Sequence, residues 1–231
     1  MLIDDSDTIG FLVTGGVLIV GDDFEKLIEV QLNEITDLAN EASLIYKDFS
    51  YLEETTDLRH FNRNRRMVRD EMIKEWLGNQ RYSIDYSRMK ISIEGKEFNF
   101  SGSYSSYKIV FIKSLAKVGI DIEMYKKISP DNIHLFASKD ELNNLSSEFE
   151  SFSALEKSTL IWCIKESVGK LFDIGLSKGF DAFKLRKRGK IYLATILNLS
   201  CEHGIKIFYK MFDEYCIVFA KFQACGMNNL K

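Results

Sequence analysis

Apolar and polar positions alternate along the chain in two ways, with a period of two in some segments and near 3.6 in others. The first period indicates a strand with one buried face, and the second indicates an amphipathic helix. The pattern predicts, in chain order, a hairpin at 10–13 and 17–20, helices at 22–38 and 59–79, strands at 82–93, 108–114 and 118–123, a helix opened by Pro130, a helix at 154–172, and strands at 180–186, 190–198, 204–211 and 215–222. Residues 45–57 are mixed and acidic and predict no element.

The order of these elements predicts an α+β fold, because helices and strands come in groups. A hairpin and helices are followed by strands, and helices and strands then occur again. This order suggests two similar halves that meet near residue 115. The 231 residues suit one large domain or two domains of roughly 100–120 residues. No sequence repeat and no low-complexity linker marks the boundary.

The composition excludes several classes of protein without indicating a function. With 45% hydrophobic and 13% aromatic residues, the chain can form a packed core and is not globally disordered. The net charge of −3, from 31 basic and 34 acidic residues, gives no general attraction to nucleic acid or to an anionic membrane. An anion-binding role therefore depends on a local cluster of basic residues.

Sulfur and imidazole ligands for a zinc site are scarce. The three histidines and four cysteines include no Cys-x-x-Cys pair, so neither a zinc ribbon nor a thioredoxin-like redox site is supported. We expect buried or half-buried thiols in a reducing compartment. The N-terminal apolar stretch lacks the basic start of a signal peptide and is too short to span a membrane, so we expect a cytoplasmic protein. The cysteines are Cys163, Cys201, Cys216 and Cys225.

The predicted strand Val118–Glu123 carries two acidic side chains on one face. Side chains alternate along a strand, so Asp121 and Glu123 point the same way, opposite to the apolar residues between them. Two neighbouring carboxylates repel each other unless a cation neutralises them, and Mg²⁺ prefers oxygen ligands of this kind. Taken alone, the strand fits an exposed face with two solvated acids better than a metal site.

The predicted helix at 154–172 places Trp162, Glu166 and Lys170 on one stripe, because they are spaced four residues apart. Glu166 and Lys170 could form an ordinary surface ion pair, which the spacing alone favours. Glu166 could instead join the two acids of the strand around a metal ion, with Lys170 balancing their charge.

Two further segments are candidates for phosphate binding. The predicted helix at 59–79 carries a basic cluster whose guanidinium groups can bind phosphate oxygens bidentately, although acids in the same helix also fit a solvated face. Gly95-Lys96 is followed by Ser101–Ser105, where hydroxyl and backbone N–H groups could hold a phosphate, although a polar turn is the simpler interpretation. The cluster consists of Arg59, Arg63, Arg65, Arg66, Arg69 and Lys74.

The order and spacing of these segments distinguish them from chance. Gly95-Lys96, Ser103-Tyr104-Ser105, Gly119–Glu123, Phe136 with Glu141, and Trp162–Lys170 follow one another as in a known family. The chain resembles the 4′-phosphopantetheinyl transferases of the surfactin-synthetase-activating (Sfp-like) type, whose hallmarks are a Gly-Ile-Asp-Ile-Glu strand and a later Trp-x-x-Lys-Glu-Ser helix. The resemblance is clear from about residue 95 to 176 and loose from 61 to 77.

The resemblance implies a Mg²⁺-dependent enzyme that transfers the 4′-phosphopantetheine group of coenzyme A to a serine of an apo acyl or peptidyl carrier protein and releases 3′,5′-ADP. Fatty-acid, polyketide and nonribosomal peptide biosynthesis use such carriers. It further implies that Asp121, Glu123 and Glu166 hold the metal ion. Glu166 is then the first candidate for the base and Glu123 the second, while Lys170 stabilises the pyrophosphate, ahead of Lys165.

The resemblance also implies contacts to the coenzyme in the N-terminal half. Arg65 or Arg66 would hold the nucleotide end together with Lys96, and Ser103, Tyr104 and Ser105 would lie near a phosphate. Tyr104 stands where the family usually has histidine, and tyrosine carries no positive charge near neutral pH. This departure predicts weaker coenzyme A binding or a different phosphate geometry, compensated by Lys108 or Arg63.

The fold implied by the resemblance is a pair of pseudo-symmetric α+β halves, residues 1–115 and 116–231, with the active site in the cleft between them. The chain would act as a monomer without a membrane or nucleic-acid partner. Carrier proteins are acidic around the modified serine, so we expect them to dock beside Met124, Lys126 and Lys127. Two alternatives stay open: a catalytically impaired homologue that binds coenzyme A or carrier protein, and a nucleic-acid-binding module that uses the arginine-rich helix.

Overall fold

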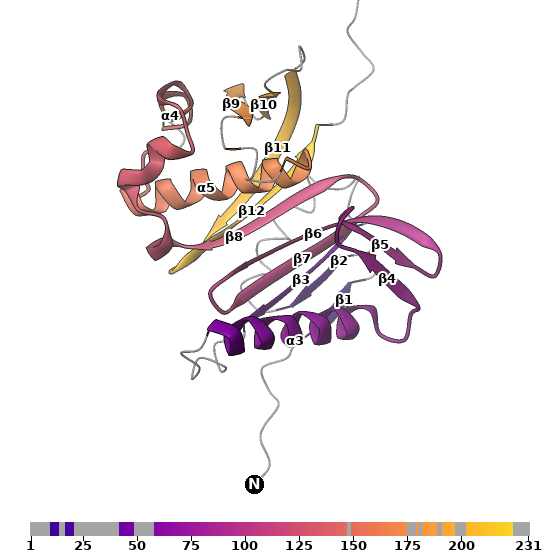
Figure 1. The fold of residues 1–231 in the computed structure, drawn as a ribbon. Helices are drawn as coiled ribbons and strands as arrows, with labels where there is room; N and C mark the ends of the chain where they lie inside the picture. The colour runs from indigo at the N-terminus through magenta and orange to yellow at the C-terminus, as the bar shows by residue number, and fades with distance from the viewer. Residues whose placement is uncertain are drawn as a thin grey trace, which may run out of the picture. The chain divides into compact units, whose positions relative to one another are not determined.

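The computed structural model (Figure 1) describes residues 10–13, 17–20, 42–48, 58–146, 149–174, 179, 182–188, 191–196 and 202–223. The chain divides into two compact units, Met1–Ala116 and Lys117–Lys231. Each unit contains a five-stranded antiparallel sheet and at least one helix, which confirms the α+β class. None of the described helices is long and apolar enough to cross a bilayer.

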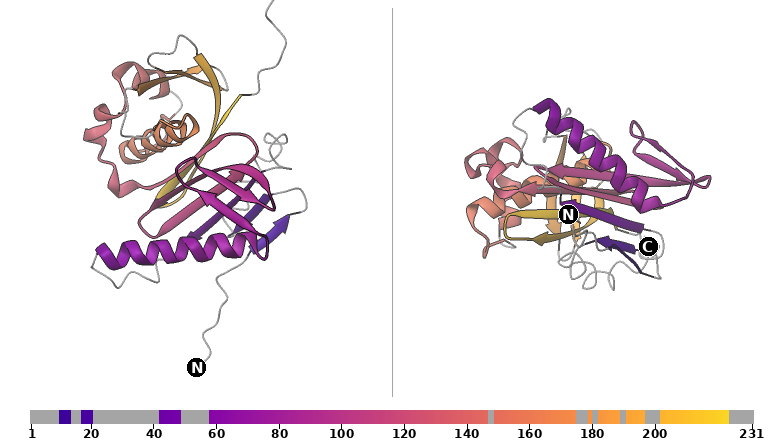
Figure 2. Two further views of the ribbon diagram at one scale, coloured as in Figure 1. Left: turned by 45° about the vertical axis from the view of Figure 1, so that its right-hand side comes forward. Right: turned by 90° about the horizontal axis from the view of Figure 1, so that it is seen from below.

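The sheet of the first unit has the strand order β3-β7-β6-β5-β4. The helix α3 (Leu58–Leu77) lies along one face of this sheet, as Figures 1 and 2 show. A separate hairpin joins β1 (Gly10–Val13) and β2 (Val17–Val20), as the sequence predicted. The sheet consists of β3 (Ala42–Asp48), β4 (Tyr82–Asp85), β5 (Lys90–Ile93), β6 (Lys96–Ser105) and β7 (Lys108–Ser114).

The core of the first unit lies between α3 and the sheet. Apolar residues recur every three or four positions along the helix, so one stripe faces the strands. Gly78 ends the helix with φ at +57°, a left-handed conformation that favours glycine. The buried helix residues are Val68, Met72, Ile73, Trp76 and Leu77, and they cluster with Ile91, Phe100, Ile109 and Phe111 of the sheet.

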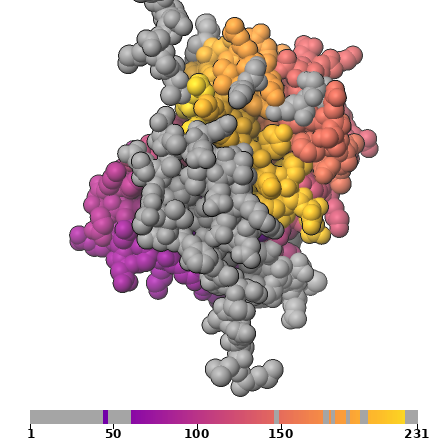
Figure 3. Space-filling model, turned by 180° about the vertical axis from the view of Figure 1, so that it is seen from behind, coloured from indigo at the N-terminus to yellow at the C-terminus, as the bar shows by residue number. Residues whose placement is uncertain are grey.

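The sheet of the second unit has the order β8-β12-β11-β10-β9, and β11 and β12 reach the surface, coloured yellow in Figure 3. The helix α5 (Ala154–Leu171) packs against it. The strands are β8 (Val118–Met124), β9 (Phe183–Arg188), β10 (Ile191–Ile196), β11 (Glu202–Met211) and β12 (Tyr215–Phe222). Between β8 and α5 lie the 3₁₀ helices η2 (Tyr125–Lys127) and η3 (Pro130–Leu135) and the helix α4 (Lys139–Ser146).

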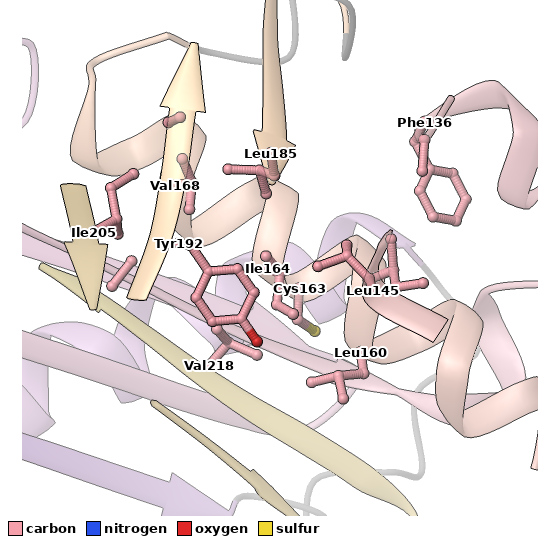
Figure 4. Close-up of a cluster of buried hydrophobic side chains, with 14 of the residues drawn as sticks. Phe136, Leu145, Leu160, Cys163, Ile164, Val168, Leu185, Tyr192, Ile205 and Val218 are labelled. Carbon is pink, nitrogen blue, oxygen red and sulfur yellow. The ribbon is translucent and has the colours of Figure 1, made fainter. Parts of the chain in front are cut away.

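The helix α5 is buried on most sides and forms the centre of the second core. Figure 4 shows Leu160, Ile164 and Val168 of this helix among apolar side chains from β9, β10, β11 and β12. The helix begins with a capping box, in which Ser153 and Glu156 each satisfy a backbone N–H of the other residue. Its first residue is therefore fixed, and so is the angular position of every later side chain.

Both units follow the same order of one strand, one long helix and a meander of four strands, the last of which pairs with the first. This order agrees with the two similar halves suggested by the sequence. The pseudo-two-fold relation and the shared cleft concern the relative placement of the units, and they stay predictions.

The structure differs from the sequence-based elements in a few places. The single strand predicted at 82–93 is a hairpin of β4 and β5, and Pro130 opens a 3₁₀ helix rather than an α-helix. The strands β3 and β6 and the helix α4 were not predicted. The helix predicted at 22–38 lies outside the described residues.

Candidate active site

The strand β8 and the helix α5 lie in close backbone contact at Gly119. A Cβ atom at this position would lie 1.9 Å from the backbone oxygen of Ser167 and 2.9 Å from the backbone nitrogen of Leu171. Both neighbours are backbone atoms of the helix, so no side-chain rotation could make room. Glycine therefore sets the distance between strand and helix, and the face of β8 that carries Gly119, Asp121 and Glu123 is turned toward α5.

Lys170 joins the end of α5 to the middle of β8. Its Nζ donates hydrogen bonds to Oδ1 of Asp121 at 2.8 Å and to the backbone oxygen of Ile120 at 2.9 Å. The carboxylate of Asp121 is buried, with 6% of its side chain exposed, so its charge needs a nearby cation. The spacing along the helix had favoured an ion pair of Lys170 with Glu166. In the structure Lys170 forms its ion pair with Asp121 instead.

Glu123 lies near the end of β8, and its carboxylate contacts residues that follow it closely in the chain. Its Oε1 lies 3.3 Å from Nζ of Lys127 and accepts a hydrogen bond from the backbone nitrogen of Met124 at 3.0 Å. Lys127 is exposed and Glu123 is half-buried. Lys127, predicted only as part of a docking surface, therefore also neutralises one of the candidate metal ligands.

Glu166 lies on α5, four residues before Lys170, and its pKa is raised to about 7. Burial is the main cause, and the negative charges of Asp121 and Glu123 add to it, while Lys170 acts in the opposite direction. The three carboxylates therefore lie within electrostatic range of one another. Near neutral pH this arrangement is under strain from like charges, and a divalent cation would relieve it.

The donor set fits a hard divalent cation, because all three groups are carboxylates. Among the described residues, however, no group of three or more His, Cys, Asp and Glu side chains has the arrangement of an assembled metal site. The ion pairs of Asp121 with Lys170 and of Glu123 with Lys127 each use one oxygen of the carboxylate, Oδ1 of Asp121 and Oε1 of Glu123. A metal ion held by Asp121, Glu123 and Glu166 would therefore share these carboxylates with the two lysines.

Lys165, the neighbour of Glu166, has a structural environment that the sequence did not reveal. Its Nζ donates to Oε1 of Glu141 at 2.9 Å and to the backbone oxygen of Phe183 at 3.0 Å, and its side chain is 1% exposed. Glu141 also accepts hydrogen bonds from the backbone nitrogens of Ser138 and Leu185. This buried network ties α5 to α4 and β9.

Two of the four cysteines lie next to Asp121, on the side of the sheet that faces α5. Cys163 of α5 and Cys216 of β12 are buried free thiols with their sulfur atoms 3.4 Å apart. Burial raises the pKa of Cys163 well above its ordinary value, and the neighbouring Cys216 and Asp121 raise it further. The expectation of buried thiols is confirmed for this pair, while Cys201 and Cys225 lie outside the described residues.

In the first unit the structure brings together Arg65 of α3 and Tyr104 of β6. The guanidinium carbon of Arg65 lies 4.2 Å from the centre of the Tyr104 ring. Arg63 and Arg66 are exposed on the same helix, and Lys108 is half-buried at the start of β7. The sequence named Tyr104 and Arg65 separately, and only the packing of helix on sheet shows that they meet.

The segment Ser101–Ser105 is part of the strand β6, so its interpretation as a polar turn is wrong. Ser103 and Ser105 are buried on one face, whereas Tyr104 is exposed on the other. Lys96 begins the same strand, eight residues before Tyr104, which corresponds to about 26 Å along an extended chain. Lys96 and Tyr104 therefore do not contact the same phosphate group.

Residues 117–220 match the family model described as the 4′-phosphopantetheinyl transferase superfamily. The matched region lies in the second unit and contains all the carboxylates discussed above together with Lys170. The resemblance found in the sequence is thus confirmed at the level of the superfamily for this region, which indicates a transferase of the phosphopantetheinyl kind. No curated protein matches the chain.

Proposed function

We propose that this protein transfers the phosphopantetheine group of coenzyme A to a serine of an apo acyl or peptidyl carrier protein, as transferases of the Sfp-like type do. The observation that carries the proposal is the contact of β8 with α5 at Gly119, which brings Asp121, Glu166 and Lys170 together. This contact lies within the residues that match the superfamily.

Asp121, Glu123 and Glu166 are the residues that would hold Mg²⁺. When bound, the ion would neutralise the negative charge of the pyrophosphate and of the attacking oxygen. The raised pKa of Glu166 supports this assignment, because a buried group of carboxylates without a cation holds protons at a pH where separate carboxylates are ionised.

Glu166 is the proposed base. The serine oxygen of the carrier attacks the phosphorus on the pantetheine side of the pyrophosphate, the bond from this phosphorus to the bridging oxygen breaks, and 3′,5′-ADP leaves. Glu166 takes the serine proton, for which a carboxyl group with its pKa raised by burial is better suited than an exposed one. Glu123 is the second candidate for this role.

Lys170 is proposed to stabilise the charge that develops on the departing phosphate. A lysine ammonium has three N–H donors, and Lys170 uses two of them for Asp121 and the backbone of Ile120. Within the described part of the chain the third donor is available for a phosphate oxygen. The pairing with Asp121 holds the ammonium group in place, so the group does not have to reorganise when the transition state forms.

The first unit is proposed to bind the nucleotide end of coenzyme A through α3 and β6. Arg65 is the preferred contact, since Arg66 lies on the exposed side of the helix. Lys96 would contact a different part of the coenzyme or none, because of its distance along β6. Acidic carrier proteins would dock near Met124, Lys126 and Lys127, of which Lys127 is already paired with Glu123.

The test is a modification assay with the purified full chain, coenzyme A, Mg²⁺ and a panel of apo acyl and peptidyl carrier proteins, followed by mass spectrometry of the carriers. We expect the phosphopantetheine mass to be added to at least one carrier, and a carrier with alanine in place of its modified serine to stay unchanged. Addition of EDTA should stop the reaction. Coenzyme A binding without modification of any carrier would identify a binding homologue instead of an enzyme.

A further inference from the structure

Tyr104 and Arg65 form a stacked pair within the first unit. The guanidinium carbon of Arg65 lies 4.2 Å from the centre of the Tyr104 ring, and Phe61 flanks the same group at 5.9 Å. Arg65 is half-buried, whereas 41% of Tyr104 is exposed. A cation held against aromatic rings in this way is confined to one position near the end of β6.

The charge of Arg65 is not balanced by an acidic side chain anywhere in the described residues. A second stack on the same helix shows the contrast. Arg69 lies 4.8 Å from the ring centre of Tyr86 but forms an ion pair with Asp70 at 2.7 Å. The two stacks have the same kind of geometry, yet among the described residues only Arg69 has an acidic side chain that pairs with its charge.

The guanidinium carbon of Arg65 lies over the Tyr104 ring, and a ring contact of this kind does not use up the N–H donors of the guanidinium group. These donors lie in one plane and match two oxygens of a phosphate group. A tyrosine at position 104 carries no charge of its own near neutral pH, but it can hold a neighbouring charge in place. The pair can thus supply the cation that a histidine at this position would supply itself.

We propose that Tyr104 is a positioning residue that fixes Arg65 by stacking, and that the fixed Arg65 binds a phosphate group of coenzyme A. The inference rests on the proposed function for the identity of the ligand. It assigns the task to Arg65 among the arginines of α3, and it assigns the ring of Tyr104, rather than its hydroxyl group, as the part that matters.

The test measures the dissociation constants of coenzyme A and of 3′-dephospho-coenzyme A by calorimetry for the full chain, four single variants and one double variant. Arg65→Gln should weaken binding about tenfold or more, which is the range of a hydrogen-bonded charge pair. Tyr104→Leu should weaken it about threefold to fivefold, and Tyr104→Phe should bind within about twofold of wild type because the ring is kept. Tyr86→Leu is the matched control and should change nothing.

The salt dependence and the double variant make the result specific. In Arg65→Gln the further change Tyr104→Leu should have no effect, because the residue to be positioned is gone. An equal loss for both ligands places Arg65 at the pyrophosphate, and a loss for coenzyme A alone places it at the 3′-phosphate; either result supports the proposal. The dissociation constant of coenzyme A should depend less steeply on salt concentration in Arg65→Gln and in the double variant than in the wild type.

Two results would overturn the inference while the proposed function stands: wild-type affinity in Tyr104→Leu, or an equal loss in Tyr104→Phe and Tyr104→Leu with carrier modification intact in the wild type. The second result would assign the hydroxyl group as the ligand. If the wild type neither binds coenzyme A nor modifies a carrier, the proposed function fails and the inference fails with it. Melting temperatures of all variants should stay close to that of the wild type, which separates lost binding from lost folding.

Discussion

The ammonium of Lys165 lies 2.9 Å from the carboxylate of Glu141 in the interior of the second unit. Lys165 immediately precedes Glu166 in α5, and Glu141 belongs to α4. The ion pair therefore fixes the helix that carries the proposed base. Glu141 is also the acidic member of a capping box at the start of α4, in which it accepts from the backbone nitrogen of Ser138. One side chain thus starts a short helix and anchors a long one.

Lys165→Met should destabilise the protein strongly, because it leaves the Glu141 carboxylate buried without its cation. A loss of about 3–5 kcal/mol in the free energy of unfolding is expected for a broken buried pair. Urea denaturation measures it. The exposed pair of Arg186 and Glu202, whose atoms are 3.0 Å apart, is the matched control, and Arg186→Met should cost less than about 1 kcal/mol. Equal losses in both variants would contradict a structural role for Lys165.

Glu141→Gln should alter the acid stability of the protein. Burial alone would raise the pKa of Glu141, but the charge of Lys165 and the hydrogen bonds from Ser138, Lys165 and Leu185 outweigh it and lower the pKa below 4.5. A lowered pKa in the folded state contributes stability that is present above pH 4.5 and is lost as the pH falls through the folded pKa. Wild type should therefore lose stability more steeply than Glu141→Gln as the pH falls below 4.5, as measured by urea denaturation at each pH. Parallel curves would contradict the coupling.

Gly119→Ala should separate β8 from α5. The added Cβ would overlap the backbone oxygen of Ser167, and because backbone atoms cannot rotate away, either strand or helix has to shift. We expect carrier modification to fall by more than tenfold and thermal stability to decrease. Gly95→Ala is the control, since nothing lies within 4 Å of that position and only its φ of +83° opposes a side chain. If activity and melting temperature survive in Gly119→Ala, the contact does not position the site.

The strand β8 and the helix α5, which carry the candidate carboxylates and Lys170, could be predicted from the sequence to within a few residues. The strand β8 has alternating apolar residues, and α5 starts at a Ser-x-x-Glu capping box and continues with apolar residues on several sides. The same signal, Ser138 followed by Glu141, precedes α4 and would have predicted that helix. Local patterns of this kind depend only on neighbours along the chain, which is why they can be read in advance.

The missed features depend on contacts that sequence neighbours do not specify. The turn between β4 and β5 contains neither glycine nor proline; Asp85 forms it by accepting hydrogen bonds from the backbone nitrogens of Ser87 and Arg88, and Met89 adopts φ of +50°. The partner of Lys170 could not be foreseen either, because Asp121 and Glu166 are both within its reach and the choice depends on how closely α5 packs at Gly119. The stack of Arg65 on Tyr104 joins a helix to a strand and has no local signature.

Glu166→Gln should abolish carrier modification without unfolding the protein. The variant keeps the size of the side chain but can neither accept the serine proton nor bind Mg²⁺ as a carboxylate. A pKa raised to about 7 means that the stability associated with Glu166 is present below its unfolded pKa of 4.5 and is lost as the pH rises through 7. In the presence of EDTA at pH 8, Glu166→Gln should therefore be at least as stable as the wild type, and the stabilisation that Mg²⁺ gives to the wild type should be absent from the variant.

Coenzyme A binding by Glu166→Gln should remain measurable, because Arg65 is untouched. The control is Glu156→Gln at the start of the same helix, which keeps the capping box and should keep full activity. Wild-type turnover in Glu166→Gln would exclude Glu166 both as the base and as a metal ligand, and would move the search for the base to Glu123.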